Sequence, residues 1–324
     1  MTSFSRRGAV VCVLAVAATT LATPAFADDI DLPSDVGDAI TGVAWNERME
    51  AALTVDDAGK IMAVDASSAR SRPVTFTGPT QSVQALSLFD DLLYIADVGD
   101  ADASRDFVTV FRVDPASEAT NFRAWDFRYP GGSQDAKALA LSGKGRIYIV
   151  TDGEDPGVYM AGLQPSRTGI NKLIRAADAP DGVTDAVFLD DGVTLMLRTA
   201  AGVELLDAYS WESRALTTYV DPPQAESITT YGEGRMLVGN GKNLRDEPLP
   251  EGVTTVTPGP SAEPTPSDSP TPSESPTPRP EASVSVAPQD AEQEGVSRRG
   301  TVLALLGAGV VAVLAGVVVF IVRD

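Results

Sequence analysis

Histidine is missing from this chain of 324 residues, and cysteine occurs once, at Cys12. Without an imidazole the chain cannot build a Ser-His-Asp triad, a Cys-His pair or a zinc site with histidine ligands. Basic residues are scarce too, 25 Lys and Arg against 45 Asp and Glu, so the net charge is −20. Because nucleic-acid phosphates bind basic surfaces, this balance excludes a nucleic-acid partner.

The first 27 residues have the three parts of a secretory signal peptide. Arg6 and Arg7 precede an apolar stretch, and Ala25-Phe26-Ala27 provides small residues around a cleavage point. We therefore predict that residues 1–27 are a signal peptide that is removed together with Cys12. The exported chain would then contain no disulfide. An uncleaved N-terminal anchor is the alternative, and it would leave the following domain on the same side of the membrane.

The other end of the chain has the pattern of a membrane anchor. Residues 301–322 are uncharged and apolar, and as a helix they would span about 33 Å, enough to cross a bilayer core. We assign residues 298–324 to a transmembrane anchor with a two-residue cytoplasmic tail. Residues 251–297 are rich in Pro, Ser and Thr and predict a disordered stalk, which would reach on the order of 130 Å when extended. The predicted location is the cell membrane, single-pass, with the N-terminal domain extracellular.

Residues 28–250 contain an internal repeat of short apolar runs separated by Asp/Gly turns. Five unit starts recur at intervals of about 45 residues, the size of a β-propeller blade; they lie at Ile40, Ser82, Asp135, Thr184 and Ala225. A second run follows each start, at residues 50–54, 92–96, 146–150, 193–197 and 236–239, and a third often follows, at residues 60–64, 107–113, 157–161 and 202–206. We predict an all-β fold, a β-propeller of five blades.

Two details refine this prediction. The fifth unit is incomplete, so we expect a strand near Ile30 to complete it and close the ring. The three tryptophans, Trp45, Trp125 and Trp211, fall in different units and are expected to pack within the blades, with a binding shelf as the alternative. A β-sandwich with accidental self-similarity is the alternative fold.

Several segments resemble secreted actinobacterial propeller proteins that are similar to the phytase-like and esterase-like propellers. The similar segments are residues 94–100, 105–113, 135–139, 145–151 and 183–186. The resemblance implies a propeller whose innermost strands direct carboxylates into a central channel, where calcium and a phosphate ester could meet. This chain departs from the family's Asp-x-Glu-x-Leu pattern. It has Ser82 and Gln84 in the second blade and Lys137 in place of Glu in the third.

Two groups of residues are candidates for a site. The first is an acidic turn that could bind Ca²⁺, formed by Asp97, Asp100, Asp102 and Asp106. Asp and Gly also serve local backbone hydrogen bonds in turns, which is the alternative explanation. The second is a channel group formed by Asp135, Lys137, Asp185 and Glu226, in which Lys137 could be a salt-bridged plug that replaces a lost metal.

Three functions follow from these features. We predict a non-catalytic, membrane-anchored extracellular propeller that binds an unidentified envelope protein or ligand in the bacterial cell envelope. The alternative is a calcium-dependent phosphoesterase or esterase-like hydrolase with a partly degenerate carboxylate site. A third hypothesis is a structural spacer that only caps the stalk. Residues 28–250 contain 19 basic and 36 acidic residues, and their net charge of −17 favours a cationic partner.

Overall fold

A computed structural model describes residues 29–37, 39–222 and 226–256. These residues are all-β apart from one short 3₁₀ helix, η1 (Glu47–Met49). The described part of the chain contains no helix long and apolar enough to cross a membrane. The predicted signal peptide and transmembrane span lie outside the described residues, as does most of the predicted stalk.

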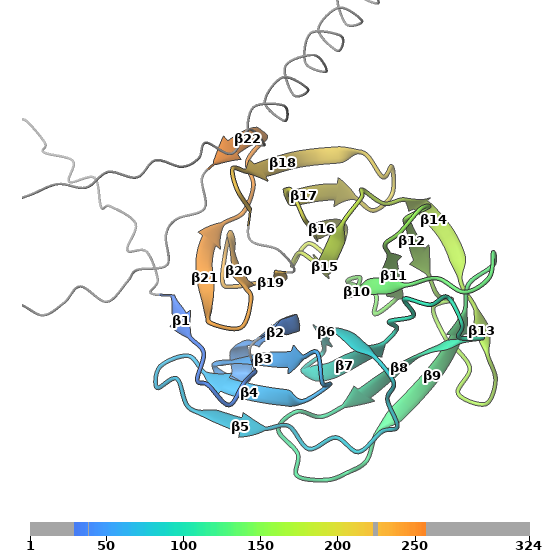
Figure 1. The fold of residues 1–324 in the computed structure, drawn as a ribbon, viewed down its shortest axis with the longest axis horizontal. Helices are drawn as coiled ribbons and strands as arrows, with labels where there is room; N and C mark the ends of the chain where they lie inside the picture. The colour runs from blue at the N-terminus through green and yellow to red at the C-terminus, as the bar shows by residue number, and fades with distance from the viewer. Residues whose placement is uncertain (1–28, 38, 223–225, 257–324) are drawn as a thin grey trace, which may run out of the picture. The chain divides into compact units, whose positions relative to one another are not determined.

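Five sheets form the five blades of a propeller, and their strands are antiparallel except for one parallel outer strand in each of two blades (Figure 1). Blade 1 contains β2 (Ile40–Asn46), β3 (Ala51–Asp56), β4 (Ile61–Asp65) and β5 (Ser71–Pro73). Blade 2 contains β6 (Val83–Phe89), β7 (Leu92–Asp97), β8 (Val108–Val113), β9 (Arg123–Arg128) and β13 (Asn171–Lys172). Blade 3 contains β10 (Ala136–Leu141), β11 (Ile147–Thr151), β12 (Gly157–Met160) and β14 (Ile174–Asp178).

The remaining two blades complete the ring. Blade 4 contains β15 (Val183–Phe188), β16 (Thr194–Thr199), β17 (Gly202–Asp207), β18 (Ser213–Tyr219) and β22 (Val253–Val256). Blade 5 contains β19 (Ser227–Thr230), β20 (Arg235–Gly239), β21 (Asn243–Pro248) and β1 (Ile30–Asp31). The innermost strands β2, β6, β10, β15 and β19 surround the centre, each beside the next (Figure 1).

The prediction of five blades is confirmed, and so is the closure of the ring. The five inner strands begin within two residues of the predicted unit starts. Ile30 of β1 pairs with Leu244 of β21, so the N-terminal strand supplies the outer strand of blade 5. The fourth strands β5, β9, β14 and β18 were not predicted. They are the outer strands and contain many half-exposed residues, so their sequences lack a continuous apolar run.

The propeller continues past residue 250, the predicted boundary of the domain. The chain leaves β21 and forms β22, which pairs in parallel with β18 of the preceding blade. All four residues of β22 are exposed. The first residues of the segment predicted as stalk therefore add a strand to the edge of blade 4.

The hydrophobic core is divided among the contacts between neighbouring blades. Leu86 and Leu53 belong to a cluster between blades 1 and 2, and Val238 and Met196 belong to one between blades 4 and 5. Trp125 stacks on Tyr94 within blade 2, as predicted. Trp45 instead packs between blades, edge-on against Tyr231 of blade 5 with ring centroids 4.8 Å apart, and it also lines the central pocket described below. Apolar burial between sheets thus holds the ring together.

Four of the inner strands carry a β-bulge at the same position, their second residue. The extra residues are Thr41, Gln84, Lys137 and Thr184. Two of them connect blades. Thr41 Oγ1 donates to the carbonyl of Val83 at 3.3 Å, and Thr184 Oγ1 donates to the carbonyl of Glu226 at 2.6 Å. A bulge re-aims one side chain and twists the strand, so this position has a structural role in every blade that shows it.

Candidate functional site

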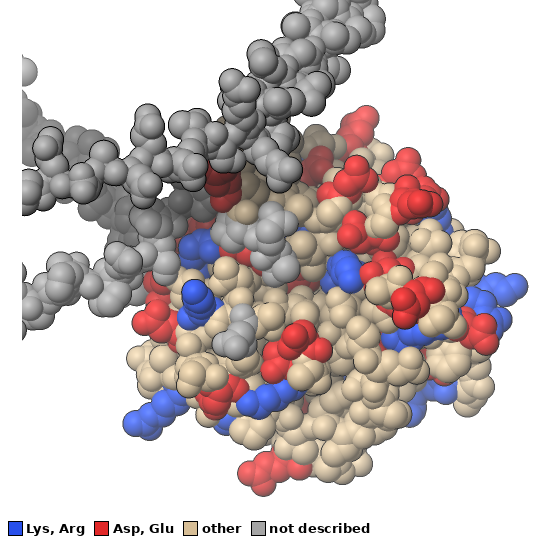
Figure 2. All heavy atoms as spheres, in the orientation of Figure 1, with Lys and Arg blue, Asp and Glu red and all other residues tan. Residues whose placement is uncertain are grey.

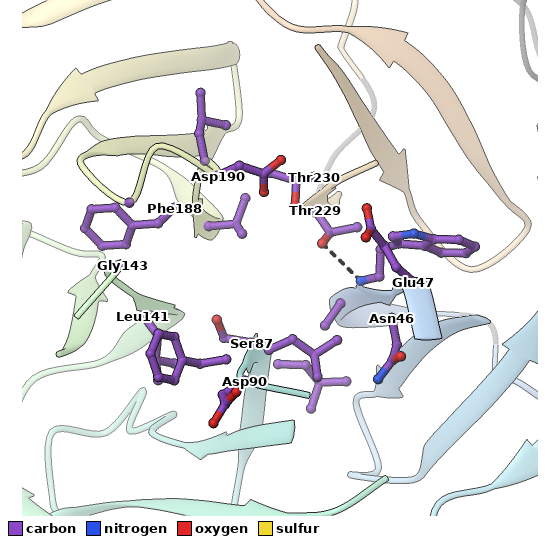
Figure 3. A pocket seen from close by; sticks show the side chains of 18 of the residues that line it. Asn46, Glu47, Ser87, Asp90, Leu141, Gly143, Phe188, Asp190, Thr229 and Thr230 are labelled. Carbon is purple, nitrogen blue, oxygen red and sulfur yellow. Dashed lines mark hydrogen bonds between the residues drawn. The ribbon is translucent and has the colours of Figure 1, made fainter. Parts of the chain in front are cut away.

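A pocket of about 400 Å³ lies at the centre of the ring, where the five inner strands end. Its wall comes from all five blades and from the first hairpin turn of each (Figure 3). Buried hydroxyls of Ser87 and Thr229 line it together with the half-buried apolar side chains of Leu88, Phe89 and Leu189. Thr229 Oγ1 accepts a hydrogen bond from the Trp45 amide at 3.1 Å, which joins blades 5 and 1 at the wall.

The charged residues that line this pocket are all acidic. They are Glu47, Asp90, Asp91 and Asp190. Figure 3 shows Glu47 and Asp190 on either side of Thr229 and Thr230, with Asp90 across the pocket beside Ser87. Asp91 lies 3.5 Å from Arg48 in an exposed ion pair. The remaining three carboxylates form no ion pair with any residue that the structure describes.

Backbone conformation and hydrogen bonds fix the turns that carry these carboxylates. Asp90 and Asp91 both have φ near +55°, as a two-residue type I′ hairpin requires. Asp191 accepts hydrogen bonds from the amides of Val193 and Thr194, each at 2.8 Å, and so fixes the turn that carries Asp190. Gly143 and Gly192 touch backbone to backbone at the mouth, where a Cβ on either residue would lie less than 3.0 Å from the other.

One wall atom of the pocket lacks a partner. Asn46 is 2% exposed, and its Oδ1 accepts a hydrogen bond from the Met49 amide at 3.0 Å as the cap of η1. Its Nδ2 has no hydrogen-bond partner among the described residues. This nitrogen has almost no accessible surface, so it lies within the wall and is not exposed to the pocket.

Among the predicted calcium ligands, Asp97 and Asp100 are buried, and the protein's own donors occupy them. Asp97 accepts from the amides of Gln81 and Ser82 and pairs with Arg105 at 2.7 Å. Asp100 accepts from the amides of Ser104 and Arg105, each at 2.9 Å. These contacts match the explanation by local turn hydrogen bonds.

The other two predicted ligands lie apart from this pair. Asp102 and Asp106 are exposed on the loop that follows. Within the residues that the structure describes, no group of three or more acidic side chains is arranged to hold a metal ion. The structure thus does not bring the four predicted aspartates together.

The predicted channel group is divided into separate contacts as well. Asp135 pairs with Lys137 at 2.8 Å and also accepts from the Asp100 amide at 2.8 Å. This is the salt bridge considered in the sequence for Lys137, and it joins the two predicted groups at one carboxylate.

Asp185 is fully buried and forms no ion pair with any residue that the structure describes. Its oxygens accept from the amides of Ala186 at 2.8 Å and Ile228 at 3.0 Å, which links blade 4 to blade 5. Burial raises the pKa of the Asp185 carboxyl well above its ordinary value, and these backbone hydrogen bonds only partly offset that effect.

Glu226 is 1% exposed and lies between two arginines. Arg198 reaches one carboxylate oxygen at 2.7 Å, and Arg245 reaches the other at 2.6 Å. Arg245 also pairs with Glu247, which accepts a hydrogen bond from the Tyr219 hydroxyl at 2.6 Å. The network therefore binds β16, β18 and β21 across the junction of blades 4 and 5, and Glu226 has no free oxygen for a ligand.

Sequence reasoning did not identify the arginine partners or the pocket at the end of the inner strands. Arg105 follows Asp97 by eight residues, and its ion pair depends on the loop turning back on itself. Glu47, Asp90 and Asp190 do share a signal, because each lies one or two residues after an inner strand of the repeat. None of the eight predicted residues lines the pocket.

Comparisons with known proteins concern the fold. No family model matches the chain, and no curated protein matches it. Among solved structures, a nidogen/laminin complex is 14% identical, covering 62% of this chain and 72% of that one, with a TM-score of 0.44. An aldose sugar dehydrogenase from Streptomyces coelicolor, bound to PQQ, is 9% identical, covering 68% and 96%, with a TM-score of 0.38. A protein assigned provisionally as a gluconolactonase is 14% identical, covering 71% and 95%, with a TM-score of 0.42.

Proposed function

We propose that this chain is a binding module of the bacterial cell envelope. In this proposal residues 1–27 direct export, residues 301–322 anchor the chain in the membrane, and the stalk over 251–297 holds the propeller outside the cell. The propeller captures an envelope component and does not turn it over. The hydropathy and composition of the two ends support the placement.

One observation carries the binding role. Three carboxylates of the open pocket at the centre of the ring form no ion pair with the described residues. The predicted calcium ligand Asp97 and the channel candidate Glu226, in contrast, are occupied by the protein's own donors. The residues that line the pocket include no lysine, cysteine or histidine. A serine or threonine hydroxyl there would have no imidazole or amine base among the lining residues. A rigid ring with a preformed pocket suits recognition.

The first experiment tests placement in intact cells. An epitope inserted in the stalk of the full chain should be labelled by antibody on intact cells, and external protease should remove it. Labelling only after permeabilisation would contradict the proposed location.

The second experiment tests binding. A photo-crosslinking residue replaces Glu233, which is exposed in the β19–β20 turn beside the pocket, and a matched variant carries it at Glu118 in an exposed outer turn. We expect a discrete adduct with one envelope component from position 233 only. If neither position gives an adduct and a chain without residues 28–250 leaves cells unaffected, the chain is a spacer and not a binding module.

A further inference from the structure

Blade 2 has a pocket whose charge is opposite to that of the whole domain. On the face drawn in Figure 2, acidic and basic side chains are interspersed around the ring. In contrast, a pocket of about 290 Å³ at the outer strands of blade 2 is lined by three arginines, Arg112, Arg123 and Arg167. We call it the arginine pocket. It concentrates positive charge in a domain whose net charge is −17.

Two of these arginines lie directly opposite each other in the sheet. Arg112 of β8 is in register with Arg123 of β9, so their side chains share one face of the blade. Like charges at directly opposed positions destabilise a sheet, and a guanidinium group does not lose its proton in a protein. The sequence therefore places two permanent cations side by side where strand pairing alone disfavours them.

The third arginine comes from a segment that crosses over from blade 3. Arg167 lies between β12 of blade 3 and β13, the short strand that joins the edge of blade 2. Asn171 fixes this segment, because its Nδ2 donates to the carbonyls of Ser166 at 2.9 Å and Asp126 at 3.0 Å. Since Asp126 belongs to β9, the loop that carries Arg167 is tied to the strand that carries Arg123.

The three guanidinium groups have no acidic partner in the protein. None of them forms an ion pair with any residue that the structure describes, and the carboxylate that lines the pocket, Asp114, lies 3.8 Å from Arg48 instead. The Arg112 guanidinium packs on two aromatic rings, with its carbon 5.5 Å from the centroid of Trp125 and 5.8 Å from that of Tyr94. These rings orient the cation but do not neutralise it.

From this geometry we infer that the arginine pocket binds a small phosphate monoester. Guanidinium groups from three segments match the three terminal oxygens and the double charge of a phosphoryl group, whereas a carboxylate has two oxygens and a single charge. Phe122 lines the same pocket, is 37% exposed and offers apolar contact to the carbon part of the ester. The pocket volume is close to the lower end for small-molecule sites, which favours a short ester.

This site is separate from the central pocket. No residue lines both. The inference therefore goes beyond the proposed function and stands whether or not the propeller captures an envelope component.

The test uses the purified full chain in detergent and phosphate-free buffer, and calorimetry follows the binding of three probes. They are glycerol 3-phosphate, dimethyl phosphate and glutarate. We expect glycerol 3-phosphate to bind and dimethyl phosphate, a diester with one charge, to bind about tenfold more weakly. Glutarate, a dicarboxylate, should also bind more weakly. Tighter binding of the diester or of glutarate would overturn the phosphate monoester as the ligand, and no binding of any probe would overturn the site.

A matched pair of double variants locates the effect. Arg123→Gln combined with Arg167→Gln should weaken glycerol 3-phosphate about tenfold or more. Arg70→Gln combined with Arg72→Gln changes the net charge equally at exposed positions on the outer edge of blade 1 and should leave the affinity unchanged. Equal loss in both double variants would mean that overall charge attracts the ester, and it would overturn the inference.

A melting experiment tests the opposed arginines themselves. Without ligand, Arg123→Gln should keep or raise the melting temperature, because it removes the like charge opposite Arg112. With saturating glycerol 3-phosphate, the wild type should gain more stability than this variant. A variant that melts lower without ligand would show that Arg123 is held by a stabilising partner within the protein, which would overturn the inference.

Discussion

Individual carboxylates in this protein have three different fates. Asp97, Asp100 and Glu226 are buried and bonded to the protein's own donors, and Asp185 is buried with only backbone donors. Glu47, Asp90 and Asp190 line the pocket and form no ion pair with the described residues. Residue type alone does not distinguish these fates. They are distinguished by the number of N–H groups within hydrogen-bonding distance of each carboxylate, because each such group lowers the free energy of the charged form.

Replacing Asp97 tests whether it is structural. Asp97→Asn removes the charge that pairs with Arg105, whose side chain is only 9% exposed, and leaves the arginine buried without its counter-ion. We expect the free energy of unfolding to fall by about 3 kcal/mol, measured by denaturant unfolding of the full chain. Asp102→Asn, on the exposed loop nearby, is the control and should change it little. Similar stability of both variants would contradict the structural role.

Asp185 should make stability depend on pH. Because its pKa is raised in the folded protein, the folded state binds a proton more readily than the unfolded state between the ordinary and the raised pKa. Its contribution to stability is therefore complete below the ordinary pKa, and it is lost as the pH rises through the raised one.

Asp185→Asn cannot titrate and should lack this contribution. We expect the difference in unfolding free energy, wild type minus variant, to shrink as the pH rises from 4 to 8. Melts of both proteins over this range give the difference directly. A constant difference would show that Asp185 is charged in the fold.

At the scale of elements, short strands and turns decide how the ring holds together. β1 has only two residues, yet it completes blade 5 and unites the start of the domain with its end. Ile30 is 4% exposed and packs in the cluster between blades 5 and 1. The ring closes by strand pairing and apolar burial without any covalent link among the described residues.

Truncating Ile30 should therefore weaken the closure. Ile30→Ala removes buried methyl groups, and we expect it to lower the free energy of unfolding by about 2–4 kcal/mol. The same change at Ile174, which is 56% exposed in β14, is the matched control and should have little effect. Denaturant unfolding of the two variants provides the comparison, and equal losses would mean that β1 does not seal the ring.

At the scale of the whole molecule, the propeller brings five similar turns together around one axis. The turns follow β2, β6, β10, β15 and β19, and none of them forms a pocket alone. The opposite ends of the inner strands carry the bulges and the ion pairs, which fill that side with hydrogen bonds. One end of the ring thus has an open pocket, and at the other end the side chains are hydrogen-bonded or ion-paired within the protein.

Calcium should therefore have no effect on the stability of the full chain. A site at 100 times its dissociation constant would add about 2.7 kcal/mol, but the oxygens of Asp97 and Asp100 are already used by backbone amides and Arg105. We expect the same melting temperature in millimolar calcium and in chelator. A clear rise with calcium that is lost in the Asp102→Asn and Asp106→Asn double variant would restore the hydrolase hypothesis.

The repeat of apolar runs by itself determined the all-β class, the five blades and the closure by a strand near Ile30, because strand alternation and turn residues are local properties. It did not predict the outer strands, whose half-exposed faces leave a weak pattern. Only the tertiary structure decided which carboxylates remain available. Asp97 meets Arg105, and Glu226 meets Arg198 and Arg245, through folding that brings distant residues into contact. Asp90 and Asp190 form no ion pair with the described residues, because no basic side chain lines the pocket that they border.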